Sequence, residues 1–290
     1  MMIKEMISTV TEIPTPDVIV QQIISTASNP NVSAKEFEKV ISMDVGLSTK
    51  ILKLVNSAYY ALPRKITKLS EAIVIIGFKT VRNLALSVFT YSALHSKTTF
   101  VDHDKLWSHF MATAIFSEQI AKSIGYMNRE EVFLAGLIHD VGKLAVDLLF
   151  PMYIFELSKV SRDLSKPMFL IEYEIGVDTH MEIGGELLRH WKFPEEYVSI
   201  AILHEKPSLN PDSPYIEMSC IVHLANVFSN IFLPGNSLSY GKPYLDQVVF
   251  KVLGIKPSRL ETMYHELEIV FNKSKDLIFG GVEDETGVQT

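Results

Sequence analysis

Residues 134–147, LAGLIHDVGKLAVD, place His139 and Asp140 next to each other in an otherwise apolar stretch. A buried carboxylate loses hydration worth on the order of several kcal/mol unless a cation or hydrogen-bond donors replace the water. We expect an apolar helix that carries this pair, stops at Gly142 and presents Lys143. The sequence therefore predicts that a compensating group lies opposite His139 and Asp140.

Three further histidines fall at helical positions that would point inward. His109 belongs to an apolar stripe, His180 opens a second helix, and His204 lies near the end of a third. One histidine in such a stripe is more often a hydrogen-bonded core residue, but four around one carboxylate favour a metal site. Neutral imidazoles and a carboxylate suit Fe, Mn, Co, Ni or Zn, whereas magnesium would require more oxygens. The remaining histidines are interpreted as surface or core residues: His95, His103, His190, His223 and His265.

The elements that must position these side chains are helices. Apolar residues recur at helical spacing along most of the chain and almost nowhere alternate as in a strand, which predicts an all-α fold. Ser33 and Thr179 each precede a glutamate by three residues, the spacing of a capping box. We expect helices to begin near residues 16, 33, 46, 70, 79, 104, 129, 143, 180, 194, 215, 244 and 257.

A polar stretch at residues 95–104, HSKTTFVDHD, separates two groups of these helices. We expect an N-terminal helical module over residues 1–97 and a second helical domain over 98–278. The final residues, 279–290, lack an apolar period and are interpreted as a flexible tail.

Composition narrows the classes of function. The chain has 290 residues and a net charge of −7, which argues against broad binding to nucleic acid, because that requires a clustered positive face. No apolar run is long enough to span a bilayer and no secretory leader is apparent, so we expect a soluble cytoplasmic protein. The single Cys220 lies in an apolar run and is interpreted as a small buried residue.

The order His109, His139-Asp140-x-Gly142-Lys143, His180, His204 resembles the HD superfamily of metal-dependent phosphohydrolases. Two further segments resemble its HDOD branch: IPTPDVIVQQI near the start and SMDVGLSTKILKLVNSAYYALPRKITKLSEAIVIIGFKTVRNLAL over residues 42–86. The resemblance covers most of the chain. It implies an N-terminal helical module packed on an HD-like helical bundle.

The resemblance also implies roles for individual residues. Catalytic HD proteins hold one metal with a first histidine, the His-Asp pair and a last aspartate, which correspond here to His109, His139, Asp140 and, in place of the last aspartate, Asn226. In HD-GYP phosphodiesterases further histidines hold a second metal bridged by the aspartate. His180 and His204 resemble two of those, and Lys143 stands where a lysine contacts substrate phosphate. The chain lacks the GYP signature after Glu205, so cyclic-dinucleotide specificity is unsupported.

Two functions remain open. HDOD proteins are generally regarded as signalling modules, and Asn226 agrees with this, because a neutral amide binds a divalent cation less strongly than a carboxylate. The first interpretation is therefore a non-catalytic regulatory protein that binds a signalling partner and keeps a degenerate metal site as a structural or sensing core. The alternative is a metal-dependent phosphohydrolase or phosphodiesterase that uses one or two ions.

A cationic segment is the candidate partner surface. RKITK at residues 64–68 and two later cations could contact DNA, but in an acidic chain they are more often a solvated face. We expect them to contribute instead to a patch that faces an acidic partner protein. The sequence leaves the oligomeric state open. The cations of this patch are Arg64, Lys65, Lys68, Lys79 and Arg82.

Overall fold

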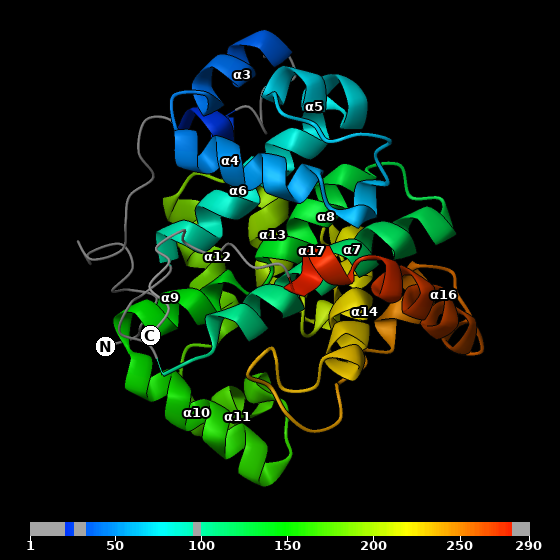
Figure 1. The fold of residues 1–290 in the computed structure, drawn as a ribbon. Coiled ribbons are helices and arrows are strands. Elements are labelled where there is room, and N and C mark those ends of the chain that lie inside the picture. Colours follow the sequence, from blue (N-terminus) through cyan, green and yellow to red (C-terminus); the bar gives the residue numbers. More distant parts are fainter. Residues whose placement is uncertain (1–20, 26–32, 95–99, 280–290) are drawn as a thin grey trace.

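The structure is a computed structural model that describes residues 21–25, 33–94 and 100–279. Within these residues the regular elements are helices, with no strand, so the predicted all-α fold is confirmed (Figure 1). None of the described helices combines the length and the apolar character needed to cross a bilayer. The helix predicted near residue 16, His95 and nearly all of the predicted tail lie outside the described residues.

The N-terminal helices α3 to α6, whose bounds follow, lie in the upper part of Figure 1. Ser33 caps the first of them: its side chain accepts from the backbone N–H of Glu36, whose carboxylate accepts from the backbone N–H of Ser33. Asp44 caps the second helix with its side chain, which accepts a hydrogen bond from the backbone N–H of Leu47. The helices are α3 (Ala34–Ile41), α4 (Val45–Val55), α5 (Leu69–Ile76) and α6 (Phe78–Leu94), with a 3-10 turn η1 (Ala58–Tyr60) after α4.

The second group of helices surrounds the polar residues that the sequence analysis singled out. Its longest helix, α7, runs through the middle of the group and packs against α8 and α14. The helices around the polar residues are α7 (His103–Ile124), α8 (Arg129–Ile138), α9 (Val141–Leu149), α12 (His180–His190), α13 (Glu195–Leu203) and α14 (Ile216–Phe232). Peripheral elements are α10 (Pro151–Leu164), α11 (Met168–Ile175), η2 (Pro207–Leu209), α15 (Val248–Val252), α16 (Arg259–Lys273) and α17 (Lys275–Phe279).

Helix α6 joins the two groups. It packs on α4 and α5 on one side and on α8 and α9 on the other, and Lys79 pairs with Glu131 across the junction at 2.8 Å. Buried apolar residues of both groups form one continuous core, which includes Ile51, Leu84 and Trp107. The boundary near residues 95–104 falls between α6 and α7, and the division into two domains stays a prediction.

Most helix starts agree with the sequence prediction, but three helices were not predicted. Helices α3 to α8, α12, α13, α14 and α16 begin within two residues of the expected positions, α9 begins two residues early, and α15 begins four residues late. Helices α10, α11 and α17 were missed. Helix α10 carries proline at its first position, a start signal hidden inside the apolar run LLFPMYIF, and α11 is short and lies between Pro167 and Gly176.

Candidate metal centre

His139 and Asp140 form the junction between α8 and α9. Helix α8 ends at Ile138 and α9 begins at Val141, so the expectation that the helix stops at Gly142 is wrong. Gly142 serves close packing instead: a Cβ at this position would lie 1.9 Å from the carbonyl oxygen of His180. The glycine thus lets the first turn of α9 approach the first turn of α12, which brings His180 toward Asp140.

The two carboxylate oxygens of Asp140 face two pairs of histidines. Oδ1 lies 3.1 Å from Nε2 of His204 and 3.3 Å from Nε2 of His180. Oδ2 lies 3.4 Å from Nε2 of His139 and 3.5 Å from Nε2 of His109. All five side chains are at most 2% exposed. The structure therefore brings together the four histidines and the aspartate that the sequence singled out.

We call the two sides of this cluster the His180 half (His180, His204 and Oδ1 of Asp140) and the His109 half (His109, His139 and Oδ2). Each half offers three donor atoms that lie within 4.8 Å of one another, a spacing that a single metal ion could bridge. Asp140 is common to both halves. The cluster could thus hold one ion or two.

The histidines that end α8 and α13 are oriented by the same local device. Nδ1 of His139 lies 2.7 Å from the carbonyl oxygen of Gly136, and Nδ1 of His204 lies 2.8 Å from that of Ala201. Each contact joins a histidine to the last turn of its own helix, where carbonyls lack helical partners. A carbonyl only accepts, so Nδ1 carries the hydrogen and Nε2 keeps its lone pair.

Side chains from other helices orient the remaining two histidines. Nδ1 of His180 lies 2.7 Å from a carboxylate oxygen of Glu172 on α11, and the capping box of Thr179 starts α12 at that histidine. Nδ1 of His109 lies 3.0 Å from the hydroxyl of Ser229 on α14, which itself donates to the carbonyl of His109 at 3.3 Å. Partners of this kind fix the ring orientation of metal-binding histidines.

The inner atoms of the cluster have no hydrogen bonds among the described residues. This holds for Nε2 of all four histidines and for Oδ1 of Asp140, all fully buried. Lone pairs of neutral imidazoles that face a carboxylate repel one another, and buried unpaired polar atoms are costly. A cation placed among them removes both penalties, so the donor set fits a transition metal.

The ionisation states agree with this donor set. Burial lowers the pKa of His109 and of His204 to about 4, so both rings are neutral. Burial would also lower the pKa of His180, but the charge of Glu172 and the contact with Asp140 raise it to about 9. Burial would raise the pKa of Asp140, but the Lys143 ammonium and the neighbouring histidines hold it well below its usual range. Without a metal, a proton on His180 thus supplies part of the missing positive charge.

Lys143 lies inside the cluster. Its side chain is fully buried, and its ammonium donates to Oδ2 of Asp140 at 2.6 Å. A lysine in the first turn of α9 can reach back to the residue that precedes the helix, which explains the contact. The ammonium therefore neutralises the shared carboxylate from the side of the His109 half.

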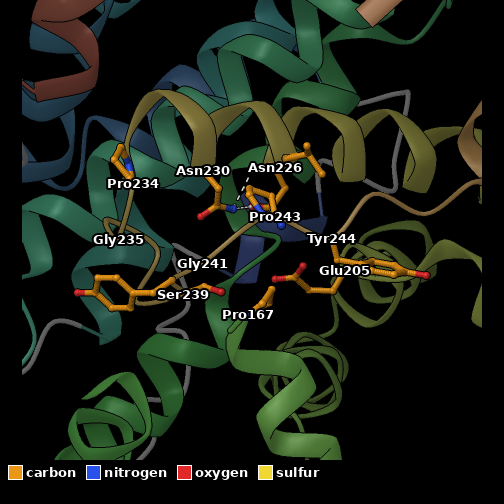
Figure 2. Close-up of a pocket in the computed structure, with 12 residues that line it drawn as sticks. Pro167, Glu205, Asn226, Asn230, Pro234, Gly235, Ser239, Gly241, Pro243 and Tyr244 are labelled. Atoms are coloured by element: carbon orange, nitrogen blue, oxygen red, sulfur yellow. Dashed lines mark hydrogen bonds between the residues drawn. The ribbon is translucent and has the colours of Figure 1, made fainter. Parts of the chain in front are cut away.

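Asn226 and Glu205 line a common pocket, and Glu205 directly follows the cluster residue His204 (Figure 2). Asn226 is 2% exposed on α14, one turn before Ser229, and its amide oxygen accepts from Asn230 at 2.9 Å. An oxygen of Glu205 lies 4.0 Å from Nε2 of both His180 and His204. Asn226 as a metal ligand stays a prediction.

Sequence reasoning gave no role to Glu172 or Ser229, which orient His180 and His109. Glu172 belongs to the unpredicted helix α11, where it follows Phe169 by three residues and Met168 by four, both fully buried. An acidic residue at an inward position of an apolar segment is a signal that could have found it. Ser229 carries no comparable signal.

The cations that were predicted to form the partner surface are exposed, with one exception. Arg64, Lys65, Lys68 and Lys79 are exposed. Arg82 is only 5% exposed, so its assignment to the partner surface is wrong. It lies on the face of α6 that packs on α8, where its guanidinium binds the Asn83 side chain at 3.1 Å and lies 3.9 Å from Glu131.

Three residues outside the cluster behave as core residues. His103 pairs with the buried Asp147 at 2.6 Å, and Nδ1 of His223 binds the carbonyl of His204 at 2.7 Å. Cys220 is buried, and burial raises the pKa of its thiol to about 12, so it is not a reactive thiolate.

The sequence is similar to known proteins over most of its length. The profile of the HDOD domain family matches residues 13–207. An uncharacterized protein from Treponema pallidum (strain Nichols) is 26% identical over 226 residues, which make up 78% of this chain. The same match makes up 43% of that protein, so the chain spans less than half the length of this relative.

Two solved structures have a similar fold. A proposed phosphohydrolase from Shewanella amazonensis SB2B superposes with a TM-score of 0.74 at 21% identity, over 94% of this chain and 96% of that one. A proposed signal transduction protein from Marinobacter aquaeolei VT8 superposes with a TM-score of 0.75 at 22% identity, over 97% of this chain and 61% of that one. At this level of identity the likeness shows the fold.

Proposed function

Since the chain belongs to the HDOD family, we propose that it is a regulatory protein of signal transduction whose HD-like half holds a transition metal as a structural or sensing core. The observation that carries this proposal is the state of Lys143. Its ammonium is fully buried and engaged with Asp140, so it is not placed to grip a substrate phosphate. The metal-binding side chains are retained while the group that would bind substrate is turned inward.

The cluster fits a metal through its own donor atoms. His109, His139, Asp140, His180 and His204 would hold it, because their unpaired inner atoms point at one another. Fe, Mn, Co, Ni or Zn suits such a set. A bound ion of this kind is a Lewis acid. In a closed core the ligands also link α7, α12 and the ends of α8 and α13, so the ion would couple these helices mechanically.

Two features argue against turnover. None of the four cluster histidines, nor Asp140, lines the pocket beside Glu205 and Asn226, so a substrate in that pocket would not touch them. The neutral Asn226 stands where the resemblance implies an aspartate, which lowers the negative charge available to a second ion. Both features favour a resident ion over an exchangeable reaction centre.

A metal-dependent phosphohydrolase is the second candidate. The pocket next to the cluster favours it, because Glu205 in the pocket wall lies 4.0 Å from Nε2 of both His180 and His204. The structural neighbour from Shewanella amazonensis SB2B is itself a proposed phosphohydrolase. Movement of Glu205 would be required to open a path to the ions.

The exposed cations of the N-terminal group are the proposed contact for a signalling partner. Arg64, Lys65, Lys68 and Lys79 are exposed, and Arg64 pairs only with Glu71 among the contacts that the structure gives it. Such a surface attracts an acidic protein through long-range electrostatics.

Metal analysis combined with a hydrolysis assay tests the proposal. Protein purified without chelator should retain Fe, Mn, Co, Ni or Zn, and Asp140→Asn, which alters the carboxylate common to both halves, should lower the content. Wild-type protein should hydrolyse bis(p-nitrophenyl) phosphate no faster than the metal alone. Hydrolysis that disappears in His139→Ala would establish the phosphohydrolase instead. Metal content below about a tenth of an equivalent, with no thermal stabilisation by added metal, would reject the metal core.

A further inference from the structure

The two oxygens of Asp140 differ in what they already bind. Oδ2 accepts a hydrogen bond from Lys143 at 2.6 Å. Oδ1 has no hydrogen-bond partner in the described residues, although it lies 3.1 Å from Nε2 of His204 and 3.3 Å from Nε2 of His180. The carboxylate oxygen without a hydrogen-bond donor is therefore the one that faces the His180 half.

The fourth donor available to each half also differs. Asn226, one turn before the Ser229 that contacts His109, offers a neutral amide oxygen that already accepts from Asn230 at 2.9 Å. Beside the His180 half, Glu205 offers a carboxylate oxygen 4.0 Å from both Nε2 atoms. A carboxylate binds divalent cations far more strongly than an amide, so the His180 half has the stronger donor set.

The spacing of these atoms suits a first-row ion. Ligands at about 2.1 Å from a metal lie roughly 3 to 3.5 Å apart when adjacent and about 4 Å apart when nearly opposite. The contacts of Oδ1 with His180 and His204 fall in the first range. The contacts of Glu205 with the same histidines are longer, at 4.0 Å, so its carboxylate is the outermost of these donors.

The charges that touch the cluster balance with a single ion. Three carboxylates contact its members, those of Asp140, Glu172 and Glu205, and Lys143 provides one ammonium. With neutral histidines they leave two net negative charges, which one divalent cation cancels. A second divalent cation would leave the same excess of positive charge in a buried site next to Lys143, and uncompensated buried charge is strongly unfavourable.

We infer that the cluster takes one divalent transition-metal ion, in the His180 half, with His180, His204, Asp140 and Glu205 as its protein donors. This inference rests on the proposed metal core and says which half of it is filled. The His109 half is then a hydrogen-bonded support in which Lys143 takes the place of a second ion. Glu205 also lines the pocket, so the carboxylate that completes the donor set is the one nearest to solvent.

Cobalt titration of metal-depleted protein tests the inference. Wild-type protein should bind one equivalent of Co²⁺, read from its visible absorption, and should melt at a higher temperature when loaded. Glu205→Gln should weaken binding by about ten- to a hundredfold, because a charge-assisted contact is lost while the shape is kept. His204→Ala should abolish binding and the thermal shift. The matched changes outside the His180 half, Asn226→Ala and His109→Ala, should each weaken binding less than about threefold.

The possible outcomes distinguish failure of this inference from failure of the proposed metal core. Binding of two equivalents, or an equal loss of affinity in Asn226→Ala and Glu205→Gln, would overturn the assignment to the His180 half while the metal core stands. No binding by wild type, with no change in melting temperature, would remove the metal core itself. Should His204→Ala fail to fold, Glu205→Gln decides alone, since Glu205 lies at the edge of the core at 7% exposed.

Discussion

The HD-like half and the N-terminal group of helices place their charges in opposite ways. In the HD-like half Asp140 and Lys143 are fully buried and bound to each other. In the N-terminal group Arg64 is 66% exposed and pairs with Glu71 at the surface. Exposed pairs contribute about 0–1 kcal/mol, whereas removing one partner of a buried pair costs about 3–5 kcal/mol.

This difference in the burial of charge indicates which region of the chain is constrained by function. A core built only for stability would be served as well or better by apolar side chains, so the buried cluster is retained at a cost that its own packing does not explain. The surface cations carry no such cost. Changes in the two regions should therefore differ strongly in their effect on stability.

The largest effect is expected for Asp140→Ala. It leaves the Lys143 ammonium buried without a partner, and the free energy of unfolding should fall by about 3–5 kcal/mol in urea denaturation of the metal-depleted protein. The double change Asp140→Ala with Lys143→Met should recover much of the loss, because no charge is then left unpaired. A loss below about 1 kcal/mol would mean that water reaches Lys143 and that the cluster is open.

Gly142→Ala should be the next most harmful. Its Cβ would lie 1.9 Å from the carbonyl of His180, so α9 and α12 must separate, and we expect about 1–3 kcal/mol of destabilisation together with weaker metal binding. Gly46→Ala in α4 is the matched change in the N-terminal group. There the nearest atom to the new Cβ is the Asp44 carboxylate at 3.3 Å, and thermal melting should change little. Equal effects at the two glycines would refute the close approach of α9 and α12.

The sequence predicted the parts of this molecule that local pattern determines. Helical period and capping boxes identified most helices, and the inward positions of His109, His180 and His204 indicated the cluster. Each of these signals lies within a few residues of the feature that it predicts. The metal itself stays a prediction.

The features that could not be predicted from the sequence depend on contacts between distant segments. Gly142 looked like a helix end because glycine also terminates helices, and only the approach of α12 shows its role. Arg82 looked like a surface cation because its burial depends on how α6 packs on α8. Glu172 was overlooked because α11 is short and was not predicted. Helical pattern says which face is inward but not which residues of two inward faces will meet.

Asn226→Asp tests whether the two halves of the cluster differ in their capacity to bind a metal ion. It adds a carboxylate one turn before Ser229, the partner of His109, and we expect a second equivalent of Co²⁺ to bind with an affinity about one to two orders of magnitude above that of wild type for a second ion. Calorimetric titration measures both equivalents. Unchanged binding would show that residue 226 does not reach the His109 half. Hydrolysis of a phosphodiester need not follow, because it also requires access for the substrate.

The smallest effect on stability is expected where charge is fully solvated. The double change Arg64→Glu with Lys65→Glu breaks only the surface pair with Glu71, so the free energy of unfolding should change by less than about 1 kcal/mol. Binding to a polyglutamate-coated sensor at low salt should nevertheless fall, because the acidic probe meets two reversed charges. Lys105→Glu with Lys159→Glu, at exposed pairs in the HD-like half, is the matched control and should leave probe binding intact. An equal loss of probe binding in both variants would show that net charge, and not the cationic patch, determines binding.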